Sequence, residues 1–105
     1  MSVIITLRTK GDAAELERRA KANPAAMAEI IETARRHGLI AHRFFGSDDE
    51  IMVCDEWPDP QSFQRFFEES RATIEPLMKE VGADGAPEVT FWRQLETGDD
   101  VGWNA

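Results

Sequence analysis

The sequence has little of what usually builds covalent or metal-bound sites. It contains one cysteine, Cys54, among 105 residues, which excludes an internal disulfide and a zinc cluster of several thiolates. It contains no tyrosine, so no phenolic side chain is available to donate a proton or bind a substrate. We expect a protein without a metal and without another cofactor.

Long apolar runs and an excess of positive charge are missing as well. No run approaches the ~20 residues that span a bilayer, and residues 1–11 lack the basic region and the cleavage site of a signal peptide. The net charge is −8, which opposes the phosphate neutralisation on which nucleic-acid affinity depends. We therefore expect a soluble cytoplasmic protein that binds neither membranes nor nucleic acid.

What is present suffices for one globular domain. The composition, with 42% apolar and 30% charged residues, is ordinary for such a domain, and a chain of this length can bury one two-layer core. There is no internal repeat. We predict a single domain over residues 1–105, of which 97–105 form a loose polar tail.

Capping and turn residues divide the chain into elements. Asp12 and Asp59 are suited to cap helices, Pro24 and Pro60 are suited to begin them, and Pro76 predicts a break. Strands are predicted where β-branched and apolar residues lie between such signals. The predicted strands are 2–9, 39–46, 50–57 and 88–95, with a helix pair after the first, a hairpin turn at 47–49 and a second helix pair after the third.

This order favours an α+β fold of the ferredoxin-like type, βαββαβ, with helices on one face of an antiparallel sheet. Such a sheet should have one apolar and one wet face, yet alternation along these strands gives one apolar set and one mixed set. The set assigned to the helix-covered core is Val3, Ile5, Leu7, Ile51, Val53, Val89, Phe91 and Leu95. The set assigned to the open face is Ile4, Thr6, Arg8, Ile40, His42, Phe44, Met52, Cys54, Glu56, Thr90, Trp92 and Gln94.

The open face is too apolar to lie in water, because contiguous apolar patches usually mark an interaction surface. A second copy of the chain is the simplest cover, and two sheets packed face to face would enclose a cavity of the kind that binds small molecules. The strand 39–46 is sensitive to register. A shift by one residue would exchange His42 and Phe44 for Ala41 and Arg43 on this face.

The segment EWPDPQSF at residues 56–63 follows an apolar strand and opens a helix. It resembles the strand-to-helix junction of the antibiotic biosynthesis monooxygenase family of dimeric α/β barrels, and the order of elements agrees over roughly residues 2–96. The resemblance implies a ferredoxin-like protomer and a homodimer formed sheet to sheet. It also implies, as in characterised members, oxygenation of aromatic or polyketide-like molecules without a metal or flavin.

Two departures from that family bear on chemistry. Its members commonly have a histidine in the helix after the Glu-Trp pair, where this chain has Phe66 or Phe67, and haem-degrading relatives use that histidine as the proximal ligand. The first strand also lacks an asparagine. Haem degradation is therefore the third and weakest option.

Few residues on the expected cavity face can carry chemistry. His42 is the candidate base, because an imidazole can abstract a proton from an acidic phenol near neutral pH. The alternative for His42 is a structural role as a hydrogen-bonded histidine, which is the commoner arrangement. Glu56 is the second catalytic candidate, if burial between subunits makes it basic, and an ion pair with Arg8 is the competing interpretation. The candidate substrate-binding residues are Arg8, Phe44, Cys54, Trp57, Trp92 and Gln94. For the cysteine and the two tryptophans, simple packing is the alternative interpretation.

Two classes of function remain. The first is a cofactor-independent monooxygenase that acts on a small planar aromatic or polyketide-like molecule in a cavity between the sheet and the dimer partner. The second is a non-catalytic dimeric module that binds a small ligand or has a structural role, which the missing histidine and tyrosine favour.

Overall fold

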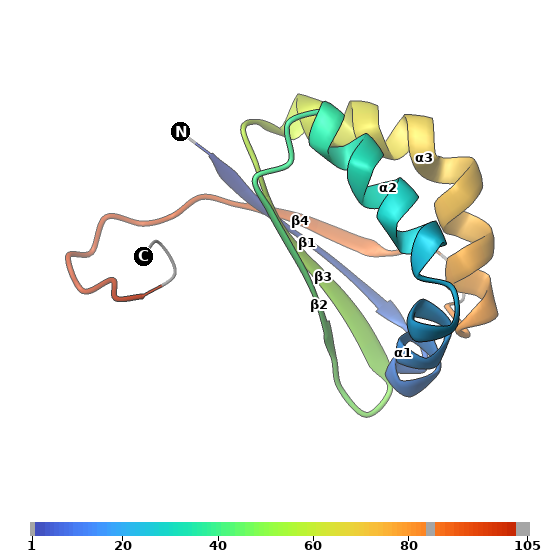
Figure 1. Cartoon of the computed structure of the whole chain (residues 1–105). Helices are drawn as coiled ribbons and strands as arrows, with labels where there is room; N and C mark the ends of the chain where they lie inside the picture. The colour runs from blue at the N-terminus through green and yellow to red at the C-terminus, as the bar shows by residue number, and fades with distance from the viewer. Residues whose placement is uncertain (1, 84–85, 103–105) are drawn as a thin grey trace.

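The structure is a computed structural model that describes residues 2–83 and 86–102. The four strands form one antiparallel sheet in the order β2-β3-β1-β4, and the helices lie on one side of it (Figure 1). The predicted ferredoxin-like α+β fold is confirmed. The elements are β1 (Val3–Lys10), α1 (Ala13–Ala22), α2 (Pro24–Arg36), β2 (Ala41–Gly46), β3 (Glu50–Trp57), α3 (Pro60–Glu80) and β4 (Glu88–Trp92).

Two of the three helices begin at the predicted capping residues. Asp12 accepts a hydrogen bond from the backbone N–H of Glu15 at 3.1 Å, and Asp59 accepts one from the backbone N–H of Ser62 at 2.7 Å. Each bond satisfies an N–H group that the first turn of a helix leaves without a partner. The helix α2 begins at Pro24 without a side-chain cap.

The predicted break at Pro76 is wrong, because α3 continues through it to Glu80. A proline inside a helix removes a backbone hydrogen bond and crowds the preceding turn. Here the helix is held on both sides of the proline: Ile74 packs against one core cluster and Met78 against the other. Tertiary packing therefore overrides the local signal.

The core lies between the sheet and the helices. Trp57 is completely buried, and its ring lies 5.9 Å from that of Phe63 and 5.4 Å from that of Phe66. The aromatic residues on both sides of the β3–α3 junction therefore anchor α3 to the sheet. The two core clusters consist of Ile5, Ala34, Trp57, Phe63 and Phe66, and of Leu16, Ile51 and Val81.

The register of β2 differs from the predicted one. His42 pairs with Asp55, and Asp55 pairs with the buried Ile5 of β1. The assignment of His42 to the open face is therefore wrong, and so is that of Phe44, which lies two residues further along the same strand. The sequence AHRFFG places a phenylalanine in both alternating sets, so either register offers one aromatic side chain to the core. The open face receives Ala41, Arg43 and Phe45 from β2 instead.

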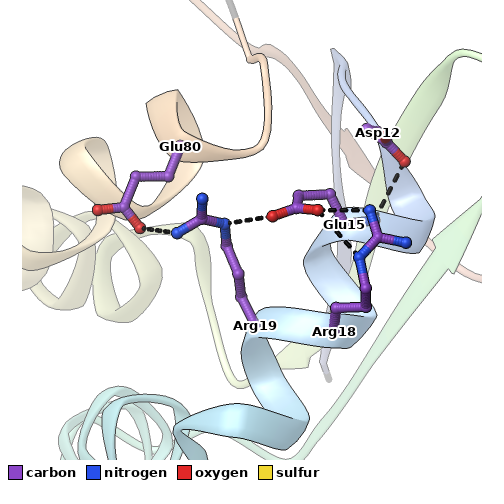
Figure 2. A network of polar contacts seen from close by, with 5 residues as sticks. All are labelled: Asp12, Glu15, Arg18, Arg19 and Glu80. Atoms are coloured by element: carbon purple, nitrogen blue, oxygen red, sulfur yellow. Dashed lines mark hydrogen bonds and ion pairs between the residues drawn. The ribbon is translucent and has the colours of Figure 1, made fainter.

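A network of charged side chains fastens α1 to the C-terminal end of α3 (Figure 2). Glu15 accepts hydrogen bonds from Arg18 and from Arg19 Nε, the latter at 2.8 Å. Arg19 Nη1 donates to Glu80 Oε2 at 2.9 Å. The backbone N–H of Asp12 donates to the carbonyl of Val81 at 2.8 Å. These ion pairs lie largely in water and add to the buried cluster of Leu16, Ile51 and Val81 at the same end of the molecule.

Candidate functional site

Asp55 on β3 is a buried carboxylate whose side chain is 6% exposed. Its Oδ1 lies 2.6 Å from His42 Nδ1 on β2, and its Oδ2 accepts a hydrogen bond from Trp57 Nε1 at 3.2 Å. Both carboxylate oxygens are therefore engaged. Asp55 was not among the site residues predicted from the sequence, although an acidic residue at an inward position between Val53 and Trp57 is a recognisable signal, because buried carboxylates are rare unless paired.

The contact with Asp55 determines how His42 can act. A carboxylate accepts hydrogen bonds, so in the neutral imidazole Nδ1 carries the proton that it donates to Asp55, and Nε2 has a lone pair. A buried carboxylate on one nitrogen and a free second nitrogen form the arrangement of an oriented general base. The His42 side chain is 23% exposed, so a ligand can reach it. The ring of Phe44 supports it edge-on at 5.0 Å.

His42 lines a hollow of about 430 Å³ between the C-terminal end of α2 and the edge strand β2. This volume lies within the range of about 300–1,000 Å³ that is usual for small-molecule sites. A ligand in this hollow would reach His42 without any contribution from a second subunit. The lining residues are Ile31, Arg35, Leu39, Ile40, Ala41 and His42.

A tight turn after α2 creates this hollow. Gly38 has a φ of 103°, in the left-handed region that favours glycine. The N–H of Gly38 donates to the carbonyl of Arg35 at 3.0 Å, and the N–H of Leu39 donates to the carbonyl of Ala34 at 3.0 Å, which closes the helix end. A Cβ at position 38 would lie 3.2 Å from Pro58 Cγ. The turn brings Leu39 and the start of β2 back against α2.

Arg8 and Glu56 on the open face each have other polar partners than the predicted one. Arg8 Nε bonds Glu50 Oε1 at 2.8 Å, and its Nη2 lies 3.8 Å from Glu88 Oε2. Glu56 accepts a hydrogen bond from Ser2 Oγ. The expected ion pair between Arg8 and Glu56 is therefore wrong, because Arg8 pairs with Met52 in the ladder, four positions away from Glu56.

Cys54 and Trp92 also lie on the open face. Burial raises the pKa of the Cys54 thiol, and the neighbouring charge of Asp55 adds to this effect against the opposing charge of Arg43. The thiol is therefore kept protonated, which favours packing over a role as nucleophile. Trp92 Nε1 donates to Thr6 Oγ1 at 2.8 Å, and the Trp92 residue is 53% exposed.

The predicted site residues do not form one cavity. The open face brings together Arg8, Cys54, Glu56 and Trp92, whereas His42, Phe44 and Trp57 belong to the helix-covered face. Trp57, a candidate substrate-binding residue, is completely buried and lies in the core. Gln94 follows the end of β4.

Two features are absent from the described residues, 2–83 and 86–102. No three histidine, cysteine, aspartate or glutamate side chains in these ranges are arranged to hold a metal ion. Within the same ranges no helix has both the length and the apolar character that a membrane crossing requires.

No family model matches the sequence, and no curated protein matches it. Solved structures do share its fold. A mutant of SnoaB, a cofactor-independent oxygenase from Streptomyces nogalater, is 16% identical with a TM-score of 0.63, over 94% of this chain and 98% of that one. A Streptomyces coelicolor monooxygenase from the gene ActVA-Orf6, in complex with Nanaomycin D, is 18% identical with a TM-score of 0.61. The match covers 91% of this chain and 88% of that one.

A dimeric ferredoxin-like protein from an uncultured marine organism is also similar, with 16% identity, a TM-score of 0.63 and coverage of 90% of this chain and 89% of that one. At these identities the likeness concerns the fold. It confirms the ferredoxin-like fold that the order of elements predicted.

Proposed function

We propose that this protein is a cofactor-independent oxygenase that removes a proton from a small, planar, acidic molecule at His42 Nε2. The observation that carries this proposal is the pairing of His42 with the buried Asp55, at the wall of a hollow that a ligand can enter. The two oxygenases of the same fold support the reaction class. Dioxygen is the oxidant, and the substrate supplies the electrons.

Proton transfer to Nε2 would leave the substrate as an anion and His42 as an imidazolium, which the Asp55 carboxylate stabilises. The electron pair of the substrate anion then reduces dioxygen, and a new carbon–oxygen bond forms. Return of the proton from His42 gives a hydroperoxide, which loses water and leaves a carbonyl group. One substrate and one dioxygen thus become one carbonyl product and one water.

Oxygen uptake with a panel of anthrones and dihydroxynaphthalenes tests this function. We expect His42→Ala to lower kcat/KM by roughly 10²–10⁴-fold, the usual contribution of a general base. His37→Ala is the matched control, because His37 contacts Glu69 at 2.8 Å and does not line the hollow. Absence of uptake across the panel, or equal rates in the His42 and His37 variants, would rule the proposal out.

We also propose that the open face pairs with that of a second copy. Phe45 of β2 and Trp92 of β4 belong to this face by register and are 45% and 53% exposed, and exposed apolar surface of this kind often marks an interaction site. We expect sedimentation to show a dimer at micromolar concentration and Phe45→Glu to dissociate it. Phe44→Glu, one residue away on the other face, should leave the dimer intact. A wild-type monomer under these conditions would contradict this assembly.

A non-catalytic ligand-binding module is the second candidate. It is favoured by the open form of the hollow, because oxygenation through a substrate anion benefits from exclusion of water. This alternative predicts that aromatic ligands perturb His42 without any oxygen uptake. Turnover that depends on His42 would exclude it.

A further inference from the structure

We propose that the hollow beside His42 binds an aromatic carboxylate and that Arg35 is the residue that binds its carboxylate group. This inference rests on the proposed function, because it takes the hollow to be the substrate site, and it narrows the substrate to a class. The ligand would place its carboxylate at Arg35, its ring against the apolar wall and an acidic ring hydroxyl at His42 Nε2.

Arg35 differs from its neighbour Arg36 in how its charge is satisfied. Arg36 Nη2 lies 3.5 Å from Glu69 Oε2 and donates to Thr33 Oγ1 at 3.2 Å. Arg35 is exposed, and no carboxylate of the described residues lies within ion-pairing distance of its guanidinium. Several N–H donors of Arg35 are therefore available to a ligand.

The backbone at the end of α2 does not take the place of a counter-ion. The carbonyls of Ala34 and Arg35 accept hydrogen bonds from the turn, at 3.0 Å from the N–H groups of Leu39 and Gly38 respectively. Apart from Arg35 and His42, the hollow is lined by apolar side chains. An anion bound here would form charge-assisted hydrogen bonds with the guanidinium, because the apolar side chains of the hollow do not compete as acceptors.

The geometry of the two partners selects a carboxylate. A guanidinium matches the two oxygens of a carboxylate with parallel hydrogen bonds, while Ile31, Leu39 and Ile40 supply an apolar surface for a flat ring. The chain carries a net charge of −8, so an anion with several charges would be repelled from most of the surface. An aromatic acid with a single negative charge offers a carboxylate to Arg35 and a flat ring to the apolar wall, and the acidic surface repels it less than an anion with several charges.

Titration with 3-hydroxy-2-naphthoate, followed by its fluorescence, tests this assignment in the full-length chain. The uncharged amide of the same compound keeps the ring and the hydroxyl and removes the charge. We expect Arg35→Gln to weaken binding of the acid by about tenfold or more, the usual loss for a charge-assisted contact, and to leave binding of the amide unchanged. Arg35→Lys should recover part of the loss.

The matched control is Arg36→Gln, which removes the same charge one residue away and outside the hollow. Equal weakening in the Arg35 and Arg36 variants would overturn the proposal, because it would indicate a general effect of charge. Equal affinity of the wild-type protein for acid and amide would also overturn it. Amide resonances of Ile31 and Ile40 should shift with the acid; shifts confined to Thr6 and Cys54 of the open face would contradict the location.

These measurements separate this inference from the oxygenase proposal. Binding of the acid that depends on Arg35, without oxygen uptake by any substrate, would support the anion site and remove the enzyme. Oxygen uptake that depends on His42 but is unchanged by Arg35→Gln would support the enzyme and overturn the anion site.

Discussion

Glu15 and Asp55 are two carboxylates that are each held by two side chains, in opposite surroundings. Glu15 lies at the surface with Arg18 and Arg19, where water screens the charges and such pairs contribute little. Asp55 is buried with His42 and Trp57, where desolvation of a charge costs several kcal/mol. A well-packed apolar residue would often serve stability as well as a buried pair. Under the proposed function, Asp55 orients His42, a role that stability alone does not require.

Removal of Asp55 should give the largest effect on stability. We expect Asp55→Ala to lower the free energy of unfolding by about 3 kcal/mol, because Trp57 Nε1 and His42 Nδ1 both lose their acceptor. The matched control is Glu56→Ala, on the open face of the same strand, with an expected loss of about 1 kcal/mol or less. Urea unfolding measures both. Equal losses would show that burial does not distinguish the two carboxylates.

Replacement of His42 should have a smaller effect on stability and a large effect on oxygen uptake. His42→Phe keeps an aromatic ring beside Phe44 and leaves Asp55 with its bond from Trp57 Nε1. We therefore expect a loss of about 1.5 kcal/mol in the free energy of unfolding, measured by the same urea titration, together with loss of oxygen uptake. A variant that unfolds like Asp55→Ala would indicate that the histidine supports the fold and that the pair is structural.

The surface network should give the smallest effect, and its pH dependence should have a defined direction. Hydrogen bonds from Arg18 and Arg19 lower the pKa of Glu15 below its usual 4.5. A carboxyl group whose pKa is lowered by folding stabilises the protein above its unfolded pKa, and this contribution is lost as the pH falls through the lowered value. An Arg18→Gln, Arg19→Gln double variant should therefore have a slightly lower urea midpoint at neutral pH.

The difference between the double variant and the wild type should shrink well below pH 4.5, and added salt should reduce it at neutral pH. Glu80→Gln, which removes the contact to α3, should cost about 0.5 kcal/mol or less. A loss comparable to that of Asp55→Ala would show that the network in Figure 2 is a main anchor of α1.

The sequence alone contained the order of the elements, the caps at Asp12 and Asp59 and the strand-to-helix junction at residues 56–63. These are local signals, because capping bonds and turns join residues that are close in the chain. His42 was also identifiable as the candidate base. Such signals were sufficient to predict the fold and one member of the candidate site.

Tertiary structure alone decided the rest. Phe44 and Phe45 make both faces of β2 apolar, so only the ladder to β3 determines that His42 faces the helices and contacts Asp55. Pro76 stays within α3 because Ile74 and Met78 pack against different core clusters. Register and packing depend on contacts between residues far apart in the chain, and such contacts form the site that local patterns could not locate.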